Sequence, residues 1–434
     1  MDFKHGCTRR DFVRAGVMGM TGLSLDSFLR LANAQESKVS GGRASALADS
    51  VLFINLAGGP AHLDTLDMKP EGPSETKGEF KPIASKLAGL QVCEHLPKFA
   101  AIADRYTLIR GISHSSGSHP LGQSYISTGN RPTPALMYPS FGSVIAKQRT
   151  QQPDLPSYIA IPKTEWNAGY LGDALAPFKT NAVPRPGQPF QVRGISLDEG
   201  VTVEQVQRRQ RLLEKIDRTF REVDTNSQLL EALDKFGQQA LKMMTSPRAK
   251  AAFDVALETE SIRKRFTDDE FNQSLLLGCR LIEFGVPFVT VTYNGWDAHL
   301  DNFGRHRKLL PPLDNGLEAI LTTLESKGLL DRTLVVVMGE FGRTPKINVN
   351  AGRDHYPRVN WCLMAGGGVQ AGRLIGGTDK GGESPDDATQ LKPDDIAATL
   401  YHVAGIDPRT EYHTNTGRPV MLVPDGRVMD ELFA

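Results

Sequence analysis

Short apolar runs alternate with helix-like amphipathic segments along most of the chain. Residues 51–56 (VLFINL), 285–293 (GVPFVTVTY) and 334–338 (LVVVM) are rich in β-branched residues, and such unbroken apolar runs predict strands buried on both faces. Residues 312–329, between the last two runs, show the period of an amphipathic helix. Because a strand, a helix and a second strand in this order form a βαβ unit, the pattern predicts parallel strands and an α/β fold.

The same alternation continues on both sides of this unit. Residues 201–266 differ, because they form a charged segment of helical period with an apolar stripe, which predicts a helical subregion inserted into the domain. The other predicted elements are helices at 271–284 and 393–404, a helix and a following strand within 96–110, and strands at 361–365 and 420–422.

The first 34 residues have the pattern of a targeting segment. Arg9 and Arg10 are adjacent, and a weakly apolar run and the cleavage signal Ala32-Asn33-Ala34 follow them. This pattern resembles a twin-arginine signal peptide, whose translocon exports proteins that have already folded. The alternative is an ordinary amphipathic helix. We therefore expect a signal peptide at 1–34, one domain at 35–434, the translocon as a partner during export, and a periplasmic or extracellular location.

The charge balance and the cysteine content narrow the class of protein further. The 434 residues include 50 basic and 50 acidic side chains, which argues against nucleic-acid binding. No later run approaches the roughly 20 apolar residues that a membrane span needs. After cleavage, Cys93, Cys279 and Cys362 would remain, too few for a disulfide framework. One bridge is possible, but buried free thiols are the main expectation.

Carboxylates and imidazoles directly follow three of the predicted strands. One such pair alone would more often be a polar loop. Because the C-terminal ends of parallel strands meet at one edge of a sheet, we expect these side chains to share a divalent metal. Mixed oxygen and nitrogen donors favour zinc, manganese or iron over calcium or magnesium. The candidate ligands are His62, Asp64, Asp297, His299, Glu340, Asp354 and His355.

Three further residues are candidates for catalysis. Arg343 could clamp an anionic substrate oxygen, or it could form a structural salt bridge. His114 and His119 flank a Ser/Gly-rich loop before a predicted helix, where they could be ligands, acid–base groups or a nucleophile, or could cap the helix. The N–H groups at such a helix start can hold an anion.

Several segments resemble known enzymes. Residues 316–342 resemble the helix, turn and strand that deliver metal ligands in sulfatases and related phosphohydrolases, and residues 392–406 are similar to a late helix of the same enzymes. This resemblance implies an alkaline phosphatase-like three-layer sandwich with a mostly parallel central sheet. The twin-arginine start and residues 58–70, 296–302 and 339–357 more closely resemble an exported family known only as domain-of-unknown-function family fifteen-oh-one.

The resemblance implies a metal-dependent hydrolase of phosphate or sulfate esters, with glycans among the candidate substrates. The chain departs from the superfamily pattern, however. Ala57 or Gly58 stands where an Asp ends the first strand, and Glu340 replaces an Asp after the 334–338 strand. His119 takes the place of the nucleophile, so either His119 attacks or binds metal, Ser118 replaces it, or water attacks. The alternative is a non-catalytic member that binds sulfated or phosphorylated polymers at the cell surface.

Overall fold

The computed structural model describes residues 46–149, 154–188, 190, 192, 242–386, 390–414 and 416–433. The predicted signal peptide at 1–34 lies outside the described residues, as does most of the predicted helical subregion at 201–266. The described end of that subregion contains α8 (Pro247–Phe253) and α9 (Glu260–Arg263).

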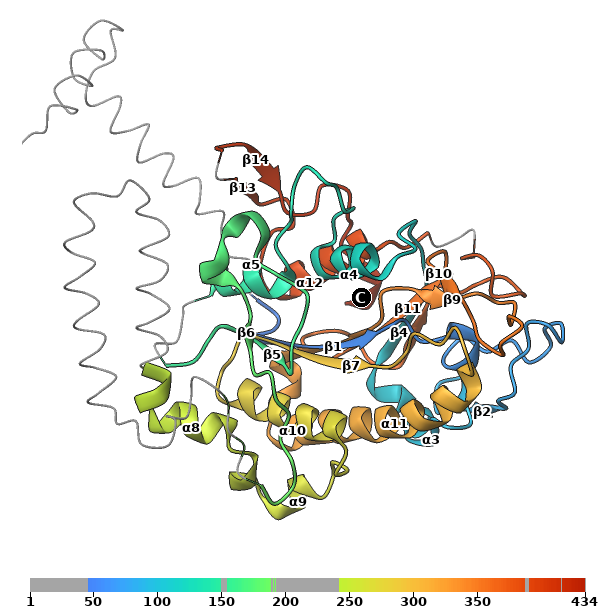
Figure 1. The fold of residues 1–434 in the computed structure, drawn as a ribbon, viewed down its shortest axis with the longest axis horizontal. Helices are drawn as coiled ribbons and strands as arrows, with labels where there is room; N and C mark the ends of the chain where they lie inside the picture. The colour runs from blue at the N-terminus through green and yellow to red at the C-terminus, as the bar shows by residue number, and fades with distance from the viewer. Residues whose placement is uncertain are drawn as a thin grey trace, which may run out of the picture. The chain divides into compact units, whose positions relative to one another are not determined.

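An eight-stranded sheet forms the centre of the fold (Figure 1). Only β11 runs antiparallel, against β4 and β8, and the other strand pairs are parallel. In order across the sheet the strands are β12 (Arg373–Ile375), β4 (Thr107–Ile112), β11 (Asn360–Ala365), β8 (Thr333–Met338), β1 (Ser50–Ala57), β7 (Phe288–Asn294), β5 (Tyr158–Ile161) and β6 (Phe178–Lys179).

The central strand β1 shows why these strands need unbroken apolar sequences. Val51 and Phe53 pack into the apolar cluster that α5 and α12 share, whereas Leu52 and Ile54 pack into the cluster of α10 and α11. Because helices cover both faces of the sheet, successive side chains of the strand are all removed from water. Asn55 is polar and also buried, 3% exposed, and its partners lie in the candidate site.

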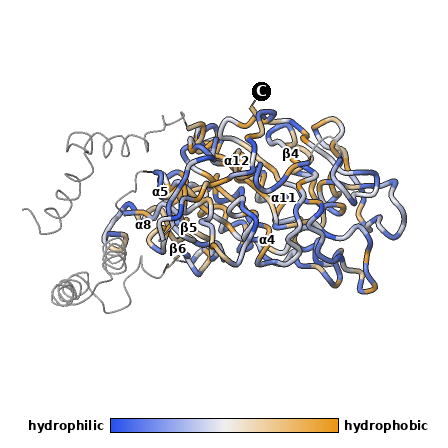
Figure 2. Tube along the Cα trace, turned by 90° about the horizontal axis from the view of Figure 1, so that it is seen from above, coloured by the Kyte–Doolittle hydropathy of each residue, from blue (hydrophilic) through white to orange (hydrophobic). Residues whose placement is uncertain are grey.

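Helices cover both faces of the sheet, so the fold has three layers (Figure 1). One face carries α4 (His119–Thr128), α5 (Phe141–Gln148) and α12 (Pro393–Val403). The other carries α3 (Pro97–Ala101), α10 (Glu270–Glu283) and α11 (Asn302–Ser326). In Figure 2, hydrophobic stretches gather in the middle of the described fold and hydrophilic stretches follow the outer loops. The predicted α/β sandwich with a mostly parallel sheet is confirmed.

Smaller elements complete the described chain. The two-stranded sheets are β2 (Pro82–Ala84) with β3 (Gln91–Cys93), β9 (Gly342–Arg343) with β10 (His355–Tyr356), and β13 (Glu411–His413) with β14 (Pro419–Met421). The short 3-10 helices are His62–Asp64, Ala103–Arg105, Gly169–Leu171, Asp173–Leu175, Val255–Leu257, Leu330–Arg332 and Asp430–Leu432.

The helix predicted at 312–329 begins earlier, as α11, at Asn302. Pro311 and Pro312 lie inside the helix. Proline has no N–H group, so the carbonyl groups of Arg307 and Lys308 lose their helical hydrogen-bond donors. Both residues are exposed, so water can reach these carbonyls. α11 connects β7 to β8, which are parallel as predicted, although β1 lies between them in the sheet.

The three cysteines agree with the prediction of buried free thiols. Cys93, Cys279 and Cys362 are free and buried, and burial raises the pKa of the Cys93 and Cys279 thiols to about 12. Among the residues that the structure describes, no helix combines the length and the apolar character needed to cross a membrane.

The buried carboxylate of Asp314 provides a test of how two helices of the same layer hold together. Asp314 on α11 accepts hydrogen bonds from the backbone N–H groups of Lys98 (3.0 Å) and Phe99 (2.7 Å), and so caps α3, whose own N-cap Leu96 has no side-chain acceptor. We expect Asp314→Ala to lower the free energy of unfolding by roughly 2–3 kcal/mol, because two helix N–H groups lose their partner. Urea denaturation measures this change.

The matched control is Glu318→Ala, one turn further along α11. The ion pair of Glu318 with Lys98 has side chains 40% and 42% exposed, so its loss should cost less than about 1 kcal/mol. Equal losses in the two variants would contradict the capping role of Asp314.

Candidate metal site

Three neighbouring strands deliver polar side chains to one edge of the sheet. In the register of β1, Ala57 lies beside Asn294 of β7 and Asn55 lies beside Met338 of β8. Because all three strands are parallel, the residues that follow them meet at this edge. The loop after β1 begins at Gly58, the loop after β7 carries Asp297 and His299, and the loop after β8 carries Glu340.

Two more segments reach the same edge. Helix α4 begins at His119, with Ser118 as its N-cap residue. The chain after β8 returns as a short antiparallel pair, β9 and β10, in which His355 lies opposite Arg343. The site is therefore assembled from segments that are far apart in the sequence.

Asp297 lies at the point where these segments meet. Its Oδ2 is 3.3 Å from Nε2 of His119, and its Oδ1 is 3.2 Å from Nε2 of His355 and 3.1 Å from Nε2 of His299. The Nε2 atoms of His299 and His355 are 3.0 Å apart. Ligand atoms of His119, Asp297 and His355 all lie within 4.8 Å of one another. We call Asp297 and these three histidines the convergent cluster.

The outer nitrogen of each histidine in the convergent cluster faces an acceptor. Nδ1 lies 2.5 Å from Oε1 of Glu340 in His119, 2.6 Å from Oδ1 of Asp354 in His299, and 2.8 Å from the Gly117 carbonyl oxygen in His355. An acceptor at Nδ1 keeps the proton on that nitrogen and leaves the Nε2 lone pair for a metal.

The residues present fit a divalent transition metal. Nε2 of His119 is buried and makes no hydrogen bond to any described residue. Separations of 3.1–3.3 Å between Asp297 and the imidazoles match the spacing of about 3.3 Å between ligands that are about 2 Å from a tetrahedral ion. One carboxylate with imidazoles suits zinc, manganese or iron, and calcium much less.

Glu340 and Asp354, predicted as ligands, contact the histidines and do not join the converging atoms. Glu340 is 1% exposed, and its carboxylate accepts hydrogen bonds from Gly58 N–H (3.0 and 3.1 Å) and Gln123 Nε2 (2.8 Å) as well as from His119. The hydrogen bond to Glu340 raises the pKa of His119, with burial opposing it. Both carboxylates therefore orient imidazoles.

His62 and Asp64 are not brought to the convergent cluster, in contrast to the prediction. Asp64 is fully buried, and Arg353 holds it through two hydrogen bonds of 2.7 and 2.9 Å, while Asn302 Nδ2 donates a third of 2.8 Å. His62 is also fully buried, with Nε2 2.9 Å from the Gly382 carbonyl oxygen, and burial lowers its pKa. Their partners make these two residues part of the interior.

The sequence left two roles open for Arg343, a clamp on a substrate oxygen or a structural salt bridge, and its contacts are those of the structural role. It is fully buried, and its Nη2 donates to Asp297 Oδ1 at 2.7 Å and to the Gly58 carbonyl, while Nε donates to the Gly59 carbonyl at 3.0 Å. Partial burial would raise the pKa of Asp297, but the hydrogen bond and charge of Arg343 outweigh it and hold that pKa well below its usual value. Arg343 thus keeps Asp297 ionised and in place.

His114 lies behind the site. Its Nε2 is 2.7 Å from the backbone carbonyl oxygen of Glu340, and its Nδ1 accepts a hydrogen bond from Ser116 N–H at 3.1 Å. Burial lowers its pKa. Both ring nitrogens are engaged with the backbone, so His114 supports the loops after β4 and β8 and stays outside the convergent cluster.

The structure also explains why no carboxylate ends the first strand. Gly58 has φ 114°, and a Cβ atom there would overlap the backbone nitrogen of Asp297. A side chain at this place is excluded while the β7 loop approaches so closely. Glu340, from the next strand, puts its carboxylate against the Gly58 N–H instead.

Sequence reasoning missed Gln123 and Asn55. Gln123 follows His119 by four residues on α4, so both face the same side of the helix. Asn55 is the one polar residue in the VLFINL run. A helical spacing of four and a polar residue inside a buried strand are the two signals that could have identified them.

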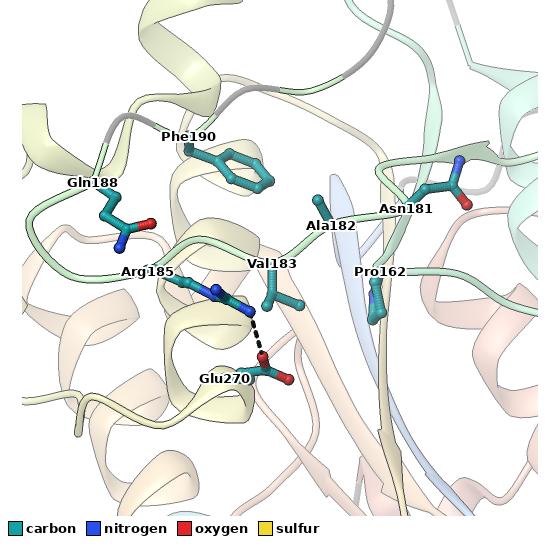
Figure 3. A pocket seen from close by; sticks show the side chains of 8 residues that line it. All are labelled: Pro162, Asn181, Ala182, Val183, Arg185, Gln188, Phe190 and Glu270. Carbon is teal, nitrogen blue, oxygen red and sulfur yellow. Dashed lines mark hydrogen bonds and ion pairs between the residues drawn. The ribbon is translucent and has the colours of Figure 1, made fainter.

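A separate groove lies beside the ends of β5 and β6 (Figure 3). An ion pair of 3.4 Å between Arg185 and Glu270 crosses it. Its lining combines an aromatic ring, amides and charged groups and shares no residue with the convergent cluster: Pro162, Asn181, Ala182, Val183, Arg185, Gln188, Phe190 and Glu270.

The fold and the site together define an α/β protein with a candidate divalent-metal centre at the C-terminal edge of its sheet. The chain belongs to the family described as "Protein of unknown function (DUF1501)", whose model matches residues 48–433. No curated protein sequence matches the chain significantly.

Solved structures similar to this chain include two sulfatases and an alkaline phosphatase. The PsFucS1 sulfatase from Pseudoalteromonas sp. has 13% identity and a TM-score of 0.41, over 93% of this chain and 75% of that chain. BT1596, a 2-O GAG sulfatase, has 12% identity and a TM-score of 0.37, over 88% and 74%. TAB5 alkaline phosphatase, in a mutant form with Mg bound, has 10% identity and a TM-score of 0.36, over 83% and 99%.

The buried pair of Asp64 and Arg353 gives a test of which carboxylates belong to the site. We expect Asp64→Asn to lower the free energy of unfolding by about 3 kcal/mol, because the charge of Arg353 stays buried without its partner. The metal content of the folded protein should not change. Denaturant unfolding and elemental analysis of the folded fraction measure the two quantities.

The variant Arg353→Met is the complementary control, since it leaves the Asp64 carboxylate unpaired and should be destabilised by a similar amount. Loss of metal from folded Asp64→Asn protein would show instead that Asp64 is a ligand.

Proposed function

We propose that this protein is a metal-dependent hydrolase of phosphate or sulfate esters. The observation that carries the proposal is the convergent cluster, in which Nε2 of three histidines points at one carboxylate while each Nδ1 is held by an acceptor. His119, Asp297 and His355 would hold the ion, and His299 adjoins them. Zinc, manganese or iron suits this donor set.

Each part of the site has a distinct task in this proposal. A divalent metal supplies Lewis-acid polarisation of the ester and a lowered pKa of water. Arg343 keeps Asp297 ionised, and Glu340, Asp354 and the Gly117 carbonyl orient the imidazoles. The N-terminus of α4 begins at His119 itself, so the positive end of the helix dipole lies beside the cluster and favours an anionic substrate.

The attacking group in this proposal is water. Nδ1 of His119 contacts Glu340 and its Nε2 faces Asp297, so the residue at the helix start is committed to the donor set. Ser118 precedes it as the N-cap residue in an extended conformation. A nucleophilic role of His119 would require it to leave both contacts.

Glycan esters are a substrate class to assay early. Pro162 and Asn181 follow β5 and β6, which are parallel to β7, so the groove of Figure 3 lies at the same edge of the sheet as Asp297. An aromatic ring with amide and guanidinium groups is a lining that can contact an extended polar substrate.

Export by the twin-arginine route is part of the proposal. It rests on Arg9, Arg10 and the cleavage signal ending at Ala34, all outside the described residues. The protein would then work folded in the periplasm or outside the cell, where it would meet an anionic polymer directly.

A second candidate function is a binding protein for sulfated or phosphorylated polymers without catalysis. The observation that favours it is the absence of a hydroxyl or thiol nucleophile at the first residue of α4, where this chain has His119. The two functions share the metal centre and differ in turnover.

Metal content tests the centre itself. We expect the purified chain to carry zinc, manganese or iron, and His355→Ala and Asp297→Asn to lose most of it, because each removes a converging atom. Elemental analysis measures this. The matched control is His402→Ala, an exposed histidine on α12, which should keep the metal content of the unchanged chain.

Turnover tests the hydrolase. We expect a chelator to abolish hydrolysis of aryl phosphate or aryl sulfate esters, metal to restore it, and Asp297→Asn to lower kcat/KM at least about 100-fold. His402→Ala should hydrolyse at the unchanged rate. Bound metal with no turnover of any ester, together with retention on a sulfated or phosphorylated polymer, would favour the binding function instead.

A further inference from the structure

The hydrogen bonds of Gln123 allow only one orientation of its side-chain amide. Its Oε1 accepts hydrogen bonds from Asn55 Nδ2 at 2.9 Å and from Trp166 Nε1 at 3.0 Å. Because the indole N–H can only donate, this end of the amide must be the oxygen. The NH₂ group of Gln123 therefore faces Glu340 Oε2, 2.8 Å away.

The carboxylate of Glu340 is surrounded by donors. Oε2 accepts from Gln123, both oxygens accept from the Gly58 N–H, and Oε1 lies 2.5 Å from His119 Nδ1. A carboxylate that only accepts requires Nδ1 of His119 to carry the proton. The Nε2 lone pair is then directed toward Asp297.

We propose that Gln123 and Glu340 are positioning residues that set the tautomer of His119 and thereby the affinity of the site for a divalent metal. This inference rests on the metal centre of the proposed function. In this proposal the half-buried amide of Gln123 and the buried carboxylate of Glu340 act together on the metal through one histidine. Hydrogen bonds from Asn55 of β1 and from Trp166 in the loop after β5 hold the amide in place.

The variant Glu340→Gln tests the positioning role of Glu340 and Gln123. Because the NH₂ of Gln123 cannot turn away, the introduced amide must direct its oxygen toward Gln123 and its own NH₂ toward His119 Nδ1. That arrangement moves the proton of His119 to Nε2 and removes the lone pair from the site. We expect Co²⁺ affinity, measured by titration of the visible absorption of the cobalt, to fall about 10- to 100-fold.

The double variant Glu340→Gln/Gln123→Glu separates this role from a merely structural one. A carboxylate at position 123 still accepts from Asn55 and Trp166 and also accepts from the introduced NH₂, so the amide oxygen turns back toward His119. We expect the double variant to regain most of the lost Co²⁺ affinity. Damage to packing alone would not be repaired by a second substitution.

Asp354→Asn is the matched control on the neighbouring histidine. The Asp354 side chain is 53% exposed beside His299, so water can replace it as acceptor, and Co²⁺ affinity should fall less than in Glu340→Gln. Thermal unfolding of each metal-free variant confirms that the compared proteins are folded.

The outcomes are distinct. Failure of the unchanged chain to bind Co²⁺ would overturn the proposed metal centre itself. Normal binding in that chain with unchanged affinity in Glu340→Gln, or with no recovery in the double variant, would overturn only the positioning role. If Glu340→Gln does not fold, Gln123→Met replaces it: loss of the donor to Glu340 should weaken Co²⁺ binding, and unchanged affinity would overturn the inference.

Discussion

The pairing of β1 with β7 on one side and β8 on the other is the constraint on which the site depends. These strands are parallel and in a register that places Ala57 beside Asn294 and Asn55 beside Met338, so the loops that follow them leave the sheet at the same level. The close approach of the β7 loop leaves no room for a Cβ at Gly58. Slippage of β1 by one residue would turn its apolar side chains to the opposite faces and move Gly58 away from Asp297 and Glu340.

Buried charge around this edge is paired in every case that the site depends on. Arg343 holds Asp297, Arg353 holds Asp64, and Glu340 accepts from three donors. Moving a charge out of water costs several kcal/mol unless a partner compensates it. Each of these pairs therefore stabilises the loops that carry it. The buried Nε2 of His119 differs from these paired groups, because it faces Asp297 at 3.3 Å and makes no hydrogen bond to any described residue.

Much of the fold could be predicted from local sequence. The runs at 51–56, 285–293 and 334–338 became β1, β7 and β8, because strands covered on both faces must be apolar at successive positions. The start of α11 could not be predicted, since two prolines inside a helix are tolerated only where the freed carbonyls reach water.

The candidate site, too, could be predicted only in part. By itself, the sequence determined that carboxylates and imidazoles follow the ends of parallel strands, and this was enough to gather Asp297, His299 and His355. Only the tertiary structure decided that Glu340 orients an imidazole and that Asp64 belongs to the interior, because their partners His119 and Arg353 are 221 and 289 residues away along the chain. The role of a carboxylate depends on which donor shares its space, and that donor is chosen by the packing of the whole fold.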